Sequence, residues 1–297
     1  MKILFIGCVK FSYDSLKALI KNKTNIVGIC TLKESKFNND FCDLSSLAKQ
    51  HNIPFKYTED INESSNTNWI KSLEPDIIFC FGWSKLLKQD LIDIPKLGVL
   101  GYHPAYLPKN RGRHPIIWAL VLGLKETAST FFFINKFADS GDILNQKVIK
   151  ITYEDTASTL YEKMTETAIK QINSFLPDLQ NNCYKKIPQD NRLSNTWRKR
   201  KKIDGLIDWR MDAENIRNLI RGLTKPYCGA SFIYEGSEYK IWEAEAVPDF
   251  FENINIEPGK VLEIKDEEII VKCGKGAIRI LNIEPNIIQV IEVGFYL

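Results

Sequence analysis

Residues 97–124 read LGVLGYHPAYLPKNRGRHPIIWALVLGL, which is an apolar run, a polar loop and a second apolar run with helical spacing. The first run is typical of a buried strand, and Ile116 to Leu124 predicts a helix. His103, Arg111 and Arg113 therefore lie just beyond the carboxyl end of a strand. Open α/β sheets form their ligand crevices at that edge. This stretch predicts an α/β protein whose site is built on the loop.

Apolar strands and helix-spaced segments alternate along the first 180 residues. The alternation predicts a doubly wound, mostly parallel, Rossmann-like sheet. The strand expected at 76–81 is continuously apolar after Asp76, as a strand buried on both faces of a parallel sheet requires. The expected strands cover residues 3–6, 26–31, 53–57, 76–81, 99–102 and 129–134, and the expected helices cover 12–21, 43–51, 66–73, 88–92, 116–124 and 156–176.

The character of the chain changes after residue 180. Residues 181–204 are polar and include the basic run Arg198-Lys199-Arg200-Lys201-Lys202, which indicates a solvated linker or, as the alternative, a polyanion-binding surface. Short alternating segments follow a helix at 213–221 and predict a small β-rich, OB-like barrel domain. We expect a catalytic domain over 1–180, a linker over 181–204 and a β-rich domain over 205–297. The expected strands of the last domain cover 230–234, 238–244, 259–264, 268–272 and 277–283.

The composition is that of an ordinary soluble globular protein. The 297 residues carry a net charge of +3, with 44% hydrophobic and 26% charged residues, which requires no nucleic-acid partner. The seven cysteines contain no Cys-x-x-Cys pair, which favours a reducing, cytoplasmic location and argues against a metal site. No apolar stretch reaches 18 residues, so we expect no membrane span.

A second polar turn, ADSGD at residues 138–142, follows the strand expected at 129–134. It places Asp139 at the same predicted sheet edge as His103. A histidine held by an aspartate beside arginines can transfer protons and bind anions. The alternative is that both loops are solvated turns, since these compositions are common in turns. Their position at the strand ends of one α/β pattern favours an active site.

Several of these motifs together resemble the 10-formyltetrahydrofolate-dependent formyltransferases, and the resemblance spans nearly the whole chain. Within that family the chain is most similar to sugar N-formyltransferases, through residues 110–120 and the stretch from 206–209 to 239–242. The residues that carry the family resemblance are Phe81-Gly82-Trp83, Leu86-Leu87, Ile94-Pro95, His103, Leu107-Pro108, Arg111-Gly112-Arg113, Pro115 and the turn Asp139-Ser140-Gly141-Asp142.

The resemblance implies a role for each site residue. His103 becomes the proton carrier while an amine attacks the donor's formyl group, and Asp139 orients the imidazole and favours its charged form. An alternative for Leu86 and Leu87 is plain core packing. The implied cofactor-binding residues are Lys85, Leu86, Leu87, Arg113, Asn135, Ala138 and Asp139, and the implied substrate-binding residues are Tyr102, Arg111 and His114.

The chain departs from the family pattern at Gly101. The family usually carries an asparagine two positions before the catalytic histidine, where its amide stabilises the developing negative oxygen. Glycine offers only a backbone N–H there, so another group must substitute or the site is weakened. Asn110 and His114 lie on the same loop, and we expect the Asn110 amide to take the role, with His103 and Asp139, as a catalytic residue. The alternative is that Asn110 only caps the turn before Arg111.

Three functions follow. The first is formylation of a 4-amino or 3-amino deoxysugar linked to UDP or dTDP, for lipopolysaccharide, O-antigen or other surface polysaccharide biosynthesis. The second is formylation of methionyl-tRNA. The family's tRNA enzymes carry a basic inserted loop, whereas the equivalent segment here, 31–47, is short and balanced in charge. The third is a degenerate, non-catalytic module that binds folate or a nucleotide sugar. The sequence leaves a homodimer open.

Overall fold

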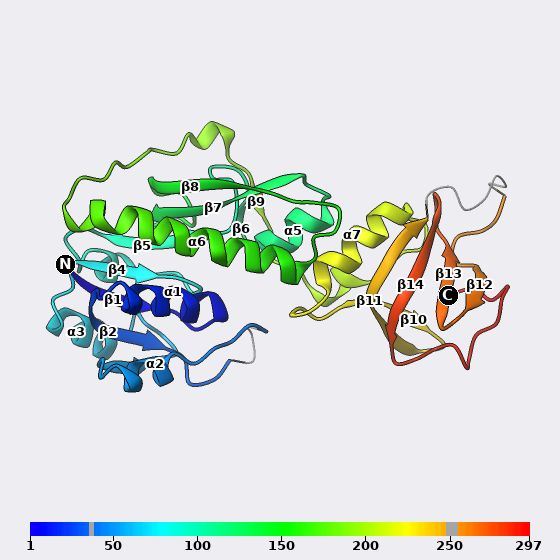
Figure 1. Cartoon of the computed structure of the whole chain (residues 1–297), viewed down its shortest axis with the longest axis horizontal. Helices are drawn as coiled ribbons and strands as arrows, with labels where there is room; N and C mark the ends of the chain where they lie inside the picture. The colour runs from blue at the N-terminus through cyan, green and yellow to red at the C-terminus, as the bar shows by residue number, and fades with distance from the viewer. Residues whose placement is uncertain (36–38, 248–254) are drawn as a thin grey trace. The chain divides into compact units, whose positions relative to one another are not determined.

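The computed structural model describes residues 1–35, 39–247 and 255–297 (Figure 1). The chain divides into two compact units. The first comprises residues 1–115, 127–149 and 162–197, and the second comprises 116–126, 150–161 and 198–297. The domain and linker boundaries expected at residues 180 and 205 stay a prediction. Part of the segment 31–47, whose length and charge argued against a tRNA enzyme, lies outside the described residues at 36–38.

A seven-stranded sheet with the order β3-β2-β1-β4-β5-β7-β8 forms the centre of the first unit. Its first five strands are parallel, and β7 runs antiparallel to β5. This confirms the expected α/β class. The strands are β1 (Lys2–Ile6), β2 (Asn25–Thr31), β3 (Phe55–Tyr57), β4 (Ile77–Cys80), β5 (Val99–His103), β7 (Glu126–Phe133) and β8 (Ile143–Lys150), and the helices are α1 (Lys10–Lys21), α2 (Ser45–Gln50), α3 (Ser64–Ser72), α4 (Gln89–Ile92) and, for most of its length, α6 (Ala157–Gln180).

Aromatic packing holds the middle of this sheet against α6. The Phe81 ring lies 5.6 Å from that of Phe5 and 5.3 Å from that of Phe131, and Phe131 in turn meets Phe175 of α6 at 4.9 Å. All four side chains are buried. Burying one such ring stabilises the fold by about 1.5–3 kcal/mol. The cluster therefore holds β7, whose end carries one of the polar loops, against β1 and α6.

The second unit is built on a five-stranded antiparallel sheet with the order β10-β11-β14-β13-β12. Helix α7 (Ala213–Leu223) buries Ile216, Leu219, Ile220 and Leu223, the spacing of one helical face. These residues share a core with Trp209, Phe232 and Ile241. The β-rich character expected after residue 205 is confirmed. Its strands are β10 (Ala230–Tyr234), β11 (Ser237–Val247), β12 (Val261–Lys265), β13 (Glu268–Lys272) and β14 (Ala277–Glu284).

Some elements were not predicted. Strand β8 lies at the edge of its sheet and exposes Lys147 and Val148, so it lacks the apolar run of a buried strand. Strands β6 (Arg111–Gly112) and β9 (Thr196–Trp197) have two residues each and pair with one another although they lie far apart in the sequence. Helix α5 (Pro115–Val121) ends before residue 124. Within the described ranges, no helix is both long and apolar enough to cross a membrane.

Candidate active site

The last residue of β5 is His103, which is 5% exposed. Its neighbour in β7 is Thr130, so the end of β5 is held in register with the sheet. The loop that follows His103 is held against β7, because the Thr130 hydroxyl donates to the Ala105 carbonyl at 2.7 Å. The imidazole is therefore placed at the carboxyl edge of the parallel strands, as the sequence predicted.

The two ring nitrogens of His103 have different surroundings. Nε2 lies 2.8 Å from the backbone carbonyl oxygen of Asn110. A carbonyl only accepts, so Nε2 carries a proton in this contact. Nδ1 lies 3.7 Å from Oδ2 of Asp139. Nδ1 is therefore the nitrogen able to take up and release a proton, and it faces a carboxylate.

Asp139 lies in the turn after β7 with a left-handed backbone, φ 53°. Aspartate tolerates this conformation better than most residues. Its Oδ2 accepts a hydrogen bond from the backbone N–H of Gly112 at 2.8 Å. The side chain of Asn135 closes the turn by accepting from the Phe137 N–H and the Ser140 hydroxyl, each at 2.9 Å. The structure thus brings Asp139 to His103, with Asn135 as support, while Ala138 is exposed on the same turn.

Arg111 is buried at 9% exposure, and its guanidinium meets the segment that follows α6. Nη2 donates to Gln189 Oε1 at 2.7 Å and to Asn191 Oδ1 at 2.8 Å. These contacts give Arg111 a structural task, and its expected role in substrate binding stays a prediction. Arg113 is half-buried and donates to the Ser84 carbonyl at 2.9 Å, which places its loop beside residues 84–88.

The side chains of the segment Lys85-Leu86-Leu87 differ in their exposure to solvent. Leu87 is 8% exposed and packs in a core cluster, as its alternative interpretation proposed, whereas Leu86 is 71% exposed. The Lys85 ammonium bonds the Glu59 carbonyl. The Asn62 amide donates to the Leu86 carbonyl at 3.0 Å, and its oxygen accepts from the Lys88 N–H at 2.7 Å. Residues 59 and 62 thus hold the segment in place, and its backbone role toward a pterin stays a prediction.

Tyr102 does not join His103. Adjacent residues of a strand point to opposite faces of a sheet. The Tyr102 ring stacks on Phe11 at 4.1 Å, and its hydroxyl accepts from Ser129 at 3.1 Å. Burial raises the pKa of this hydroxyl. These contacts place Tyr102 in the core, while His114 lies at φ 54° directly before α5.

The space beside Gly101 is filled. A Cβ at this position would lie 2.8 Å from Ile134 Cγ1 and 3.1 Å from Phe132 Cζ. The asparagine usual in the family therefore has no room unless these side chains move. Asn110 has a left-handed backbone, φ 63°, and contributes its carbonyl to His103 and its N–H to Asn195 Oδ1. Its side-chain amide as oxyanion donor stays a prediction.

Two contributors to the site, Gln189 and Asn195, were missed because they lie in the expected linker. Gln189 joins Arg111 to the turn of Asp139, and Asn195 holds the Asn110 N–H. The backbone joins the two segments as well, because the Arg111 N–H donates to the Asn195 carbonyl at 3.1 Å. No local pattern signals these partners, since polar residues in a polar stretch read as solvated.

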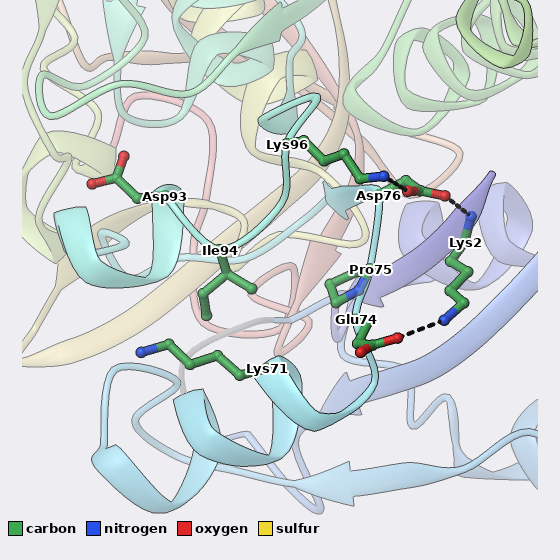
Figure 2. A pocket seen from close by; sticks show the side chains of 8 residues that line it. All are labelled: Lys2, Lys71, Glu74, Pro75, Asp76, Asp93, Ile94 and Lys96. Atoms are coloured by element: carbon green, nitrogen blue, oxygen red, sulfur yellow. Dashed lines mark hydrogen bonds and ion pairs between the residues drawn. The ribbon is translucent and has the colours of Figure 1, made fainter.

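A surface hollow of about 620 Å³ lies elsewhere, where β1 and β4 begin (Figure 2). Figure 2 shows two ion pairs among its charged side chains, Lys2 with Glu74 at 3.1 Å and Lys96 with Asp76 at 3.1 Å, and draws no contact for Lys71 or Asp93. The amino ends of parallel strands lie at the edge opposite their carboxyl ends. The hollow is therefore separate from His103 and Asp139.

Two family models match the chain: Formyl transferase over residues 1–176, and Formyl transferase, C-terminal domain, over 199–293. The methionyl-tRNA formyltransferase of Caldanaerobacter subterraneus subsp. tengcongensis is 34% identical over 96% of this chain and 92% of its own length. The bifunctional polymyxin resistance protein ArnA of Wigglesworthia glossinidia brevipalpis is 33% identical over 95% of this chain, which spans only 42% of that relative.

Solved structures share the fold. WlaRD, a sugar 3N-formyl transferase solved in the presence of dTDP and 5-N-formyl-THF, matches with a TM-score of 0.71 and 21% identity, over 96% of this chain and 98% of its own. The N-formyltransferase of Helicobacter canadensis, in complex with folinic acid and dTDP-3-aminofucose, matches with a TM-score of 0.70 and 19% identity, over 94% and 98%. Methionyl-tRNA formyltransferase from Clostridium thermocellum matches with a TM-score of 0.63 and 16% identity, over 95% of this chain and 99% of its own.

At the carboxyl edge of this α/β sheet an imidazole faces a carboxylate, an arrangement suited to proton transfer. The chain belongs to the formyl transferase family. This confirms the expected class of enzyme, a formyltransferase, and the expected donor, 10-formyltetrahydrofolate, agrees with the folate ligands of the solved relatives.

Proposed function

We propose that this chain transfers the formyl group of 10-formyltetrahydrofolate to the amine of a nucleotide-linked amino-deoxysugar. The observation that carries the transfer step is the arrangement of His103, whose Nε2 is committed to a backbone carbonyl while Nδ1 faces Asp139. An attacking amine must lose a proton, and Nδ1 is placed to accept it. The Asp139 carboxylate then stabilises the positive ring by charge attraction.

Negative charge that develops on the formyl oxygen needs a donor as well. The loop 109–113 folds back over His103, because the Asn110 carbonyl bonds its ring. The Asn110 side chain then lies on the loop nearest the imidazole, and its amide donates without changing charge. We assign it the oxyanion role that the family gives to the asparagine absent at Gly101.

The formylated folate is held between two loops that the described contacts already order. Arg113 bridges to the Ser84 carbonyl, which joins the loop of His103 to residues 84–88. Backbone N–H and carbonyl groups of Lys85, Leu86 and Leu87 suit the donor–acceptor edge of a pterin, and the turn 135–139 forms the facing wall. When bound, the folate supplies the formyl carbon that the amine attacks.

The acceptor class is argued from the basic run 198–202, because several of its side chains bind partners within the second unit. Arg198 binds Asp204 through both terminal nitrogens, at 2.7 and 2.5 Å. The Arg200 guanidinium lies 4.7 Å from the Trp118 ring centroid and bonds the Asp204 carbonyl. Lys202 pairs with Glu238 at 2.6 Å. Carboxylates thus neutralise Arg198 and Lys202, which weakens the attraction of the run for RNA phosphates and supports a small acceptor over tRNA.

The two sugar-acting relatives also match the fold more closely than the tRNA enzyme, with TM-scores of 0.71 and 0.70 against 0.63. Those two structures were solved with dTDP or dTDP-3-aminofucose, and we propose a UDP- or dTDP-linked 3-amino or 4-amino sugar here. The product would serve surface polysaccharide assembly, such as that of lipopolysaccharide or O-antigen. A cytoplasmic location and a homodimer remain part of the proposal.

The second candidate is methionyl-tRNA formylation, which the 34% identity over 96% of the chain favours. One assay separates the candidates. Purified chain is mixed with 10-formyltetrahydrofolate and either dTDP- or UDP-linked amino sugars or methionyl-tRNA, and tetrahydrofolate release is followed, with His103→Asn as the matched control. We expect turnover with an amino sugar. Turnover with methionyl-tRNA alone supports the second candidate, and folate binding without turnover on any acceptor supports a non-catalytic module.

A further inference from the structure

His103 Nδ1 and Asp139 Oδ2 face one another, but no hydrogen bond joins them. At 3.7 Å the two atoms are beyond hydrogen-bonding distance. The turn of Asp139 and the strand of His103 must therefore be held in place by other contacts. Asp139 Oδ2 is fixed by the Gly112 N–H, which belongs to the residue after Arg111. What holds loop 109–113 against the turn thus decides the geometry of the pair.

Gln189 makes that connection with both polar atoms of its side chain. Its Nε2 donates to the backbone carbonyls of Asp139 at 2.9 Å and Gly141 at 2.7 Å. Its Oε1 accepts from Arg111 Nε at 3.2 Å and Nη2 at 2.7 Å. An amide has two N–H donors and two acceptor lone pairs, so all four are used. A shorter or differently charged side chain cannot make the same four contacts.

The surrounding backbone makes this connection stiff. Loop 109–113 pairs with residues 195–197 through β6 and β9, and the Arg113 N–H donates to the Trp197 carbonyl at 3.0 Å. Gly112 is required at this crossing, because a Cβ there would lie 2.3 Å from the Trp197 oxygen. Asn195 also holds the N–H of Asn110, whose carbonyl bonds His103. Residues 189–197 therefore support both members of the pair.

We propose that Gln189 is a positioning residue that sets the orientation of Asp139 toward His103 and thereby the rate of formyl transfer. The inference rests on the proposed roles of His103 and Asp139 and is independent of the acceptor. Gln189 acts through the Asp139 backbone and through Arg111, and it touches neither reactant. Its loss lowers kcat on the order of 10- to 100-fold, because small misplacements of catalytic groups are costly, while KM for the folate changes little.

Two variants and one control test this. Gln189→Ala removes all four contacts, and Gln189→Glu keeps the acceptor for Arg111 but loses both donors to the carbonyls. Arg192→Ala is the matched control, because Arg192 lies in the same segment, is exposed and bonds Asp190. The chain has three histidines, His51, His103 and His114, so the imidazole ¹⁵N spectrum is simple, and His103→Asn assigns the signals of interest.

We expect the wild-type His103 ring to show the Nε2–H tautomer, and both Gln189 variants to shift its signals and lower kcat while Arg192→Ala does neither. Folded Gln189 variants with an unchanged His103 spectrum overturn the proposal, and so does a lower melting temperature without that spectral change. A wild-type-like Gln189→Glu also overturns it, since the carbonyl contacts would then be dispensable. The spectrum needs no acceptor, so an error in the proposed acceptor leaves this result readable.

Discussion

Nδ1 of His103 faces Oδ2 of Asp139 across 3.7 Å, while the opposite ring nitrogen is held by a backbone carbonyl. This relationship assigns proton uptake to Nδ1 and leaves Nε2 as an anchor. The carboxylate therefore acts on the nitrogen that changes its protonation state. The predictions on turnover follow from this division between the two nitrogens.

His103→Asn should remove nearly all turnover, by roughly 100- to 10,000-fold, because it eliminates the group that accepts the amine proton. Binding of the folate should stay within a few-fold, since the loss falls on proton transfer. Steady-state rates and folate titration measure the two effects separately. Turnover within ten-fold of wild type would assign the proton to another group.

Asp139→Asn should also be severe. The amide oxygen can still accept from the Gly112 N–H, so the turn is retained while the negative charge facing His103 is lost. We expect kcat to fall roughly 100-fold or more with an unchanged melting temperature. Asp142→Asn in the same loop is the control and should keep its activity. Equal losses in both variants would point to the turn and not to the charge.

Asn110→Gly tests the oxyanion assignment without backbone strain. Asn110 has φ 63°, a conformation glycine adopts readily and alanine does not. Glycine also keeps the carbonyl that holds His103. If the amide is the oxyanion donor, Asn110→Gly and Asn110→Ala should both lower kcat by about 100-fold or more. An unimpaired Asn110→Gly would leave asparagine with only its turn-capping role.

Gly101→Asn should not restore a family-like site. Its Cβ would meet Ile134 at 2.8 Å, so the variant should lose about 1–3 kcal/mol of stability through overpacking. Ile134→Ala removes the obstructing side chain. Gly101→Asn should therefore cost less stability when it is added to Ile134→Ala than when it is added to the wild type. Urea denaturation of the wild type, the two single variants and the double variant measures the free energies of unfolding for this double-mutant cycle. Additive losses would show that the two positions do not compete for space.

The contribution of the Asp204 carboxylate to the free energy of unfolding should depend on pH. Hydrogen bonds from the Arg198 side chain and the Lys201 backbone N–H hold the pKa of this carboxyl well below its usual range. A lowered folded-state pKa adds stability that is fully present above the unfolded pKa of about 3.9 and is lost as the pH falls toward the folded value. Asp204→Asn should thus destabilise the protein at pH 7 and less so at pH 3. Urea midpoints at both pH values check this, and a pH-independent difference would contradict it.

The local pattern of the chain determined the strands of the parallel sheet, the β-rich second region and the position of His103 at a strand end. These features depend on whether each residue prefers water or a core, and such preferences repeat with the period of a helix or strand. The motif resemblance added the family. Strand β5, expected over 99–102 and found at Val99–His103, shows how far this reasoning reaches.

Only the tertiary structure decided how the site is supported. The pairing of Arg111 with Thr196 and the four contacts of Gln189 join residues that are far apart in the chain, and backbone partners leave no mark in residue type. The burial of Tyr102 and the filling of the space beside Gly101 depend on neighbours from other strands and helices. Contacts of this kind form only when the whole unit has closed, because chain entropy opposes each long loop until many contacts offset it together.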